Sequence, residues 1–274
     1  MNEPIFHPAT AKVLANLTRN LPQSLLLSGP RGVGLTTAAH WLIGAHVIDQ
    51  LIPHDSKGQP TDNGTIGVEM IRRLYEQTRS QTSTKRSIII KNADRMSSGA
   101  SAAFLKLLEE PTPQTHFILT SHQPQLLLPT IRSRVQHTAI QPLSSTQTDQ
   151  FIASLGVTDP TKKAQLTFIA SGLPAELSRL VSDDTYFQTN AMTMSDARDF
   201  LQADPYKKLL IVQRYRQDRS HAVQLVDAAL SILHRSLSTK PQHGIVQQIE
   251  RLLEVRERLA ANGNAMLQLT HFVI

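Results

Sequence analysis

The chain has 274 residues, of which 40% are apolar and 18% charged, a balance typical of a soluble globular protein rather than a disordered one. The lack of cysteine excludes disulfides and thiolate metal sites, and a formal net charge of +6 is compatible with a nearby polyanion such as nucleic acid. No apolar run approaches the roughly 20 residues of a membrane helix, and the first residues lack an export-signal pattern, so we expect a cytoplasmic location and no membrane contact.

The first half of the chain alternates strand-like with helix-like segments. Short apolar runs predict four strands, at residues 24–28, 87–90, 115–120 and 137–140. Helical periodicity predicts three helices between them, at residues 36–47, 66–79 and 101–110. Residues 49–65 collect proline, glycine and aspartate and indicate a loop. Strands that alternate with helices are typical of an α/β domain with a parallel sheet.

The second half of the chain, after Pro142, contains no convincing strand. Helical periods predict three short helices, at residues 151–155, 162–171 and 174–181. The polar residues 182–195 indicate a linker. The remainder is again helical, with clear periods at residues 209–215, 222–236 and 245–260. We therefore expect an all-helical region after the α/β domain.

A degenerate phosphate-binding loop is indicated at residues 29–36, which read Gly-Pro-Arg-Gly-Val-Gly-Leu-Thr, follow a predicted strand and open a predicted helix. The spacing matches the motif G-x-x-x-x-G-K-[ST] at every position but one. The loop has three glycines, which allow backbone N–H groups to turn inward: Gly29, Gly32 and Gly34. Thr36 stands where a hydroxyl would bind magnesium, and Leu35 replaces the lysine that would contact the β- and γ-phosphates. The alternative is a glycine-rich turn that never held a ligand, and the full eight-residue context favours the degenerate loop.

The acidic motif of an ATPase is also altered. An active site of this class needs acids directly after a second strand, to hold magnesium and to orient the attacking water. Here the strand 87–90 is followed by Lys91 and Asn92. Taken alone, Lys91 reads as a solvated side chain at the end of a strand in a protein that never bound ATP. Together with Leu35, it predicts an inherited site that has lost hydrolysis.

Three further segments resemble the clamp-loader branch of the AAA+ proteins. They are Leu-Lys-Leu-Leu-Glu-Glu-Pro at residues 105–111, the sensor strand at 115–121, and the segment 128–135, which contains Ser-Arg-Val where the family has Ser-Arg-Cys. Their order and spacing match the family over about residues 20–142, and residues 262–267 extend a looser match to the end of the chain. With its altered ATP site, the chain resembles the delta-prime type of bacterial DNA polymerase III clamp-loader subunit.

The resemblance implies the domain organisation. Residues 1–142 would form an AAA+ P-loop-type α/β domain with a parallel sheet and a degenerate ATP site. Residues 143–185 would form a small helical lid, and residues 190–274 an all-helical C-terminal collar domain for oligomerisation. No zinc module is expected, because the short segment 45–65 contains no cysteine.

The resemblance also implies which residues act. Arg134 would enter the ATP site of a neighbouring subunit as an arginine finger, and Ser133 would position its loop. Ala175 stands where ATP-binding relatives carry the sensor-2 arginine. The degenerate nucleotide site would comprise Gly29, Gly32, Gly34, Leu35, Thr36, Lys91, Asn92, Thr120 and Ala175. No metal ligands are expected, and Val135 is expected to fill the space of the family's cysteine.

The expected function is that of a non-hydrolysing subunit, which supports ATP-driven loading of the sliding clamp onto primed DNA. It would not be an enzyme on its own and would need no cofactor, because ATP and magnesium are bound by neighbouring subunits. Its partners would be motor subunits of the gamma/tau type and a clamp-opening subunit of the delta type. The sliding clamp and primed DNA would be contacted indirectly.

Two other functions stay open. One is a diverged ATP-binding clamp-loader motor of the gamma/tau type, and the other is an AAA+ scaffold or adaptor without a role in replication. A basic stretch offers a possible contact with DNA phosphates, although a solvated helix face is the favoured reading. It contains Lys207, Lys208, Arg214, Arg216 and Arg219.

Overall fold

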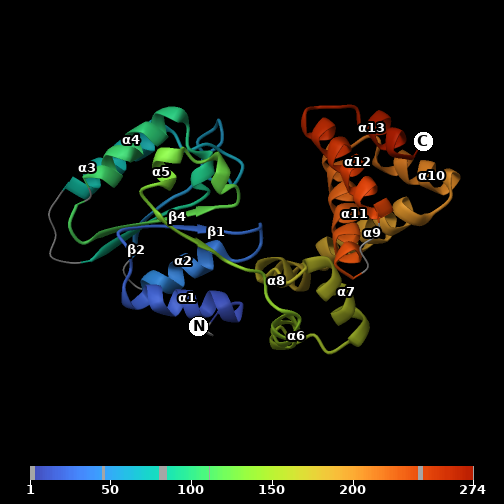
Figure 1. Ribbon diagram of the computed structural model, residues 1–274, viewed down its shortest axis with the longest axis horizontal. Helices are drawn as coiled ribbons and strands as arrows, with labels where there is room; N and C mark the ends of the chain where they lie inside the picture. Colours follow the sequence, from blue (N-terminus) through green and yellow to red (C-terminus); the bar gives the residue numbers. More distant parts are fainter. Residues whose placement is uncertain (1–3, 45–46, 80–84, 111, 240–242, 274) are drawn as a thin grey trace. The chain divides into compact units, whose positions relative to one another are not determined.

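The structure is a computed structural model that describes residues 4–44, 47–79, 85–110, 112–239 and 243–273. The chain divides into two compact units, residues 1–179 and residues 180–274. The first unit contains the sheet and the second is built from helices (Figure 1). The predicted fold class, an α/β domain followed by helices, is confirmed.

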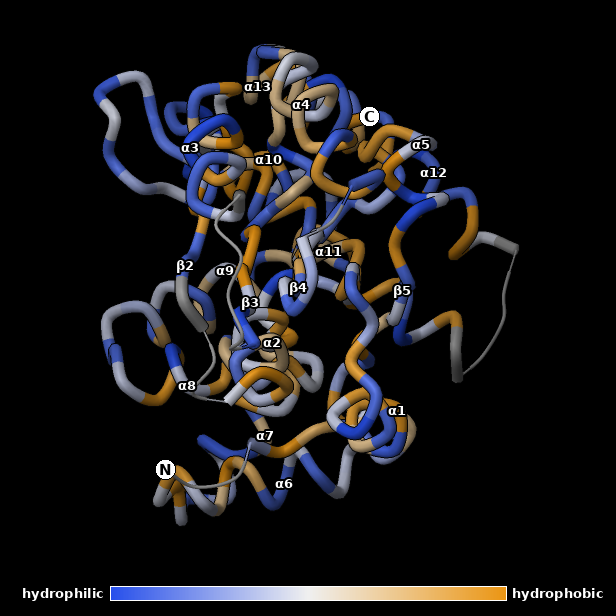
Figure 2. Tube along the Cα trace, turned by 90° about the vertical axis from the view of Figure 1, so that its left-hand side faces the viewer, coloured by the Kyte–Doolittle hydropathy of each residue, from blue (hydrophilic) through white to orange (hydrophobic). Residues whose placement is uncertain are grey.

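Five parallel strands form the sheet of the first unit, in the order β2-β3-β4-β1-β5. The strands are β1 (Ser24–Ser28), β2 (Val47–Leu51), β3 (Arg86–Ile90), β4 (Thr115–Ser121) and β5 (Gln136–Ala139). Every residue of β1 and β3 is buried, which agrees with continuous apolar runs in a parallel sheet covered on both faces. Figure 2 shows the isoleucines of β3 as an apolar stretch.

Helices cover both faces of this sheet (Figure 1). Successive side chains of a strand point to opposite faces, and the apolar clusters follow this alternation. Ile89 packs in the cluster with α1 (Pro8–Arg19) and α2 (Leu35–Ile43), whereas Ile88 packs in the cluster with α3 (Val68–Arg79) and α4 (Ser98–Glu109). Three short elements complete the layer: η2 (Ala93–Arg95), η3 (Pro124–Leu126) and α5 (Pro129–Arg132).

Three helices follow the sheet. They are α6 (Ser145–Ser154), α7 (Pro160–Ala170) and α8 (Pro174–Ser182), and the division between the two units falls within α8. A capping box starts α6, because the Ser144 hydroxyl accepts from the Gln147 N–H while the Gln147 side chain binds back to the Ser144 N–H. This region lies where the helical lid is predicted.

The second unit has its own apolar core. It contains α9 (Asp184–Gln202), α10 (Pro205–Tyr215), α11 (Arg219–Thr239), α12 (His243–Ala260) and α13 (Ala265–Val273). Phe200, Leu225, Leu252 and Leu269 are fully buried in it. The rings of Phe200 and Phe272 stack with their centroids 5.1 Å apart. The apolar side chains from all five helices therefore meet in a single cluster.

Two expectations about secondary structure were wrong. Residues 47–51 form β2 rather than the end of a helix and the start of a loop, although residues 45–46 lie outside the described part. This strand stands at the edge of the sheet and pairs with β3 through its backbone, so its polar Asp49 and Gln50 conceal it in the sequence.

Residues 182–195 are not a linker, because most of them belong to α9. Asp183 caps that helix through the Tyr186 N–H at 2.9 Å, and Phe187 is buried.

Candidate functional site

The glycine-rich loop connects β1 to α2, as a phosphate loop does. Gly34 caps α2 with a φ of 93°, a conformation that only glycine adopts readily. A Cβ on Gly29 would lie 2.7 Å from the Ile140 carbonyl oxygen, so a side chain there has no room. Thr36 is the second residue of α2 and is half-buried. The loop is therefore a tight strand-to-helix turn in which Gly29 and Gly34 are difficult to replace.

Leu35 is a core residue in this loop. Its exposed fraction is 4%, and it belongs to the apolar cluster between the sheet and helices α1 and α2. Its Cδ2 lies 3.5 Å from the position that a Cβ on Gly29 would occupy, so the side chain lies against the first glycine of the loop. Leucine supplies neither a positive charge nor a hydrogen-bond donor to this position.

The first turn of α8 is bonded directly to the loop. The Ala175 N–H donates to the Gly32 carbonyl oxygen at 3.0 Å. Ala175 is in the first turn, where backbone N–H groups lack partners within the helix. A Cβ on Gly32 would lie 3.5 Å from the Glu176 Cβ, so loop and helix are in close contact. The sequence did not predict this bond, because it joins two backbone groups more than 140 residues apart.

A small cavity of about 220 Å³ lies between the loop, the first described residues and α8. Gln147 Nε2 donates to the Phe6 carbonyl oxygen at 2.5 Å and fastens the N-terminal segment to α6. The lining side chains are neutral and mainly apolar: Pro4, Ile5, Phe6, Val33, Gly34, Thr37, Phe151, Pro174, Ala175 and Ser178. Such a lining can contact an apolar group, but it contains no cation for a phosphate.

Lys91, Asn92 and Thr120 follow or end strands at the same edge of the sheet as the loop. The Asn92 N–H donates to Thr120 Oγ1 at 3.2 Å. Asn92 has a φ of 48°, and its Nδ2 donates to Asp62 Oδ1 at 3.2 Å. The Lys91 N–H donates to the Leu51 carbonyl oxygen at 2.9 Å. Asn92 and Thr120 thus lie side by side, and the Asn92 side chain binds Asp62, a partner that the sequence did not reveal.

Arg134 lies on the surface just after α5. Its Nη1 donates to the Thr130 carbonyl oxygen at 3.1 Å, and its Nη2 lies 2.9 Å from Glu109 Oε1. The Ser133 hydroxyl also donates to the Thr130 carbonyl oxygen, at 3.0 Å. Val135, which replaces the family's cysteine, is 8% exposed. The sequence pointed to Arg134 and Ser133 through their motif but gave no indication of the Glu109 contact.

Part of the basic stretch in the second unit serves the fold. Arg214 Nη1 lies 2.8 Å from Oδ1 of the buried Asp196. The Tyr215 hydroxyl donates to Asp196 Oδ2 at 3.0 Å, and burial of the ring, with a contribution from Asp196, raises the pKa of Tyr215 to about 12. Arg219 donates to the Asn262 side chain. These partners make Arg214 and Arg219 structural residues.

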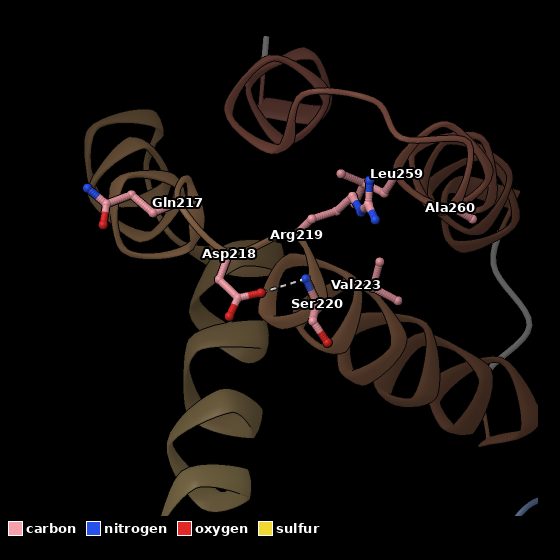
Figure 3. Close-up of a pocket in the computed structure, with 7 residues that line it drawn as sticks. All are labelled: Gln217, Asp218, Arg219, Ser220, Val223, Leu259 and Ala260. Carbon is pink, nitrogen blue, oxygen red and sulfur yellow. Dashed lines mark hydrogen bonds between the residues drawn. The ribbon is translucent and has the colours of Figure 1, made fainter. Parts of the chain in front are cut away.

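The second unit also has a hollow of about 530 Å³ at the start of α11 (Figure 3). Its residues are Gln217, Asp218, Arg219, Ser220, Val223, Leu259 and Ala260. The Asp218 carboxylate accepts from the His221 and Ser220 N–H groups, which lowers its pKa. Asp218 therefore caps α11, and its carboxylate is engaged by the helix.

The residues that the structure describes contain no group of three or more histidine, cysteine, aspartate or glutamate side chains arranged to bind a metal ion. Over the same residues, every helix is too short or too polar to cross a bilayer.

The sequence is similar to those of replication proteins. A family described as DNA polymerase III, delta subunit, matches residues 46–144. A DNA polymerase III delta-prime subunit of Bacillus subtilis is 26% identical over 242 residues, or 78% of this chain and 73% of the relative. One from Yersinia pestis is 31% identical over 108 residues, or 39% of this chain and 31% of the relative. A solved DNA polymerase III gamma-subunit-related protein of Thermotoga maritima has the same fold, with a TM-score of 0.55 at 18% identity over 95% of this chain and 97% of its own.

Proposed function

We propose, from the premise that this chain belongs to the DNA polymerase III clamp-loader family of AAA+ proteins, with delta-prime subunits among its relatives, that it is a subunit that does not hydrolyse ATP itself. In this role it supports loading of the sliding clamp onto primed DNA in the cytoplasm. Its partners are motor subunits of the gamma/tau type and a clamp-opening subunit of the delta type, while clamp and DNA are contacted indirectly. The predicted lid (143–185) and collar (190–274) belong to the same proposal.

The buried position of Leu35 carries the proposal. A motor subunit needs a lysine here, because charge-assisted bonds from its ammonium group stabilise the β- and γ-phosphates. Leu35 is instead packed in the apolar cluster beside α1 and α2. A cation at this position would have to leave that cluster to meet a phosphate, since unpaired lysines are almost never fully buried.

Two further positions support the same conclusion. Lys91 stands where a carboxylate would hold magnesium, and a cation there repels the metal. Ala175 has only a methyl group where the sensor-2 arginine of a motor would lie, and its N–H already binds Gly32. These residues do not fit a magnesium triphosphate, so we derive no chemical step at this site.

The chain would contribute to catalysis through Arg134, at a neighbour's site. An arginine finger stabilises the charge on a transferring phosphoryl group and raises the rate on the order of 10³–10⁵. The Arg134 side chain is 38% exposed, so it is accessible to another subunit. Its position after a short helix anchored in the core supports this role.

ATP turnover by the isolated chain and by the assembled complex tests the proposal. We expect no turnover by the isolated chain and no saturable binding of a fluorescent ATP analogue with magnesium. In a complex with the motor and clamp-opening subunits, Arg134→Ala should remove most of the turnover, whereas Thr36→Ala should change nothing. Turnover by the isolated chain that Thr36→Ala abolishes would establish a diverged motor. Turnover in the complex that is insensitive to Arg134→Ala would leave a scaffold.

A further inference from the structure

Glu109 is the partner of Arg134 on the surface of the first unit. We propose that Glu109 is a positioning residue, which orients the Arg134 guanidinium for a phosphate of the neighbouring subunit. This inference rests on the proposed function of Arg134. It adds Glu109 to the residues expected to act in that reaction, Arg134 and Ser133.

Two contacts hold the two terminal nitrogens of Arg134 in different directions. Nη2 is 2.9 Å from Glu109 Oε1, at the last residue of α4, and Nη1 donates to the Thr130 carbonyl oxygen in α5. A guanidinium group has five N–H donors in one plane. Within the described residues these contacts use one donor on each terminal nitrogen. The Nε–H and the second hydrogen of each terminal nitrogen are left to bind phosphate oxygens.

The backbone beneath this side chain is fixed by the core. Ile131 is fully buried and Val135 is 8% exposed, one on each side of Arg134. The Arg134 N–H donates to the Ile131 carbonyl oxygen at 3.0 Å. Because the backbone is held, the main conformational entropy lost when a phosphate binds is that of the long Arg134 side chain. A partner that orders this side chain in advance reduces that loss and favours the transition state.

The size of the effect follows from the exposure of the pair. The side chains of Arg134 and Glu109 are 38% and 52% exposed. An exposed ion pair of this kind shifts an equilibrium about 1.5- to 5-fold. A carboxylate that mainly repelled phosphate or competed for the guanidinium would have an effect of the opposite sign. The direction of the change in turnover therefore distinguishes a positioning residue from a restraint.

The test uses the complete complex of this chain with the motor and clamp-opening subunits, in the presence of clamp and primed DNA. Glu109→Ala is expected to lower kcat for ATP about two- to fivefold without a change in KM, and Glu109→Gln, which keeps a hydrogen-bond acceptor, should lower it less. Glu110→Ala is the matched control, because Glu110 is the adjacent exposed carboxylate and forms no ion pair with another described residue. Gel filtration verifies that each complex assembles.

A double variant separates action through Arg134 from any other role of Glu109. Adding Glu109→Ala to Arg134→Ala should cause no further loss of turnover. A further loss would show that Glu109 acts independently of Arg134 and would overturn the inference. An unchanged or raised kcat in Glu109→Ala would also overturn the inference. If Arg134→Ala still removes most of the ATP turnover in that case, the proposed function of Arg134 survives. If Arg134→Ala itself has no effect, the proposed function fails first.

Discussion

Replacement of Leu35 by alanine tests whether the loop residue has become part of the core. In a motor subunit the side chain at this position extends to the phosphates, so shortening it would cost little folding stability. Here Leu35 is 4% exposed and packs in the cluster beside α1 and α2. Leucine-to-alanine changes in a core cost about 2–5 kcal/mol. Leu35 is the first residue of α2, where the preceding loop can move partly into the space, so we expect about 2.5 kcal/mol, near the low end of that range.

The assay is urea denaturation followed by tryptophan fluorescence. The single tryptophan of the chain, Trp41, lies in α2 and packs against the same cluster, so its signal reports on this part of the first unit. With m near 2 kcal/mol per molar urea, the midpoint should fall by about 1 M. Leu126→Ala is the matched control: Leu126 is 61% exposed, and its midpoint should hardly change. A loss below about 0.5 kcal/mol for Leu35→Ala would refute the argument that this side chain is structural.

Three further predictions concern single groups. Arg214→Ala leaves the buried Asp196 without its cation and should cost about 2 kcal/mol, whereas Lys208→Ala, measured by the same denaturation with circular dichroism, should cost almost nothing. The pKa of Tyr215 is about 12 in the folded state and about 10 in the unfolded state, so the unfolded state ionises first and folding stability is lost as pH rises from about 10 to about 12. Tyr215→Phe should remove that part of the loss of stability. A pH profile of stability identical to that of the unchanged protein would contradict this prediction. Lys91→Asp should not create magnesium-dependent binding of a fluorescent ATP analogue, because the loop still lacks its lysine, and tight binding would show that Lys91 alone blocks the site.

The sequence identified the strands whose side chains are buried on both faces. β1, β3 and β4 each contain a run of three large apolar residues, and these side chains carry the signal. β2 was missed because it contributes mainly backbone hydrogen bonds, which leave little trace in residue types. α9 was missed for a related reason: its early turns are polar, and Phe187 alone marks the buried side of those turns.

The candidate site also has features that the sequence predicts and contacts that it does not. The glycine spacing identified the loop, since Gly29 and Gly34 are required by close approach and by a positive φ. The pairs Glu109–Arg134 and Asn92–Asp62 were not foreseen, because each joins residues 25 or more positions apart. Such contacts depend on the packing of the whole sheet layer and have no local pattern. A motif can point to a candidate residue, but the residue that contacts it is known only once the fold is known.

The bond between Ala175 and Gly32 links the first turn of α8 to the glycine-rich loop through two backbone groups of the same chain, with a net contribution of about 1 kcal/mol. Because no side chain takes part, substitutions along either segment leave both partners of the bond in place. Under the proposed function, the spacing of loop and helix would then be independent of nucleotide, and this face of the chain would keep one shape while neighbouring subunits turn over ATP.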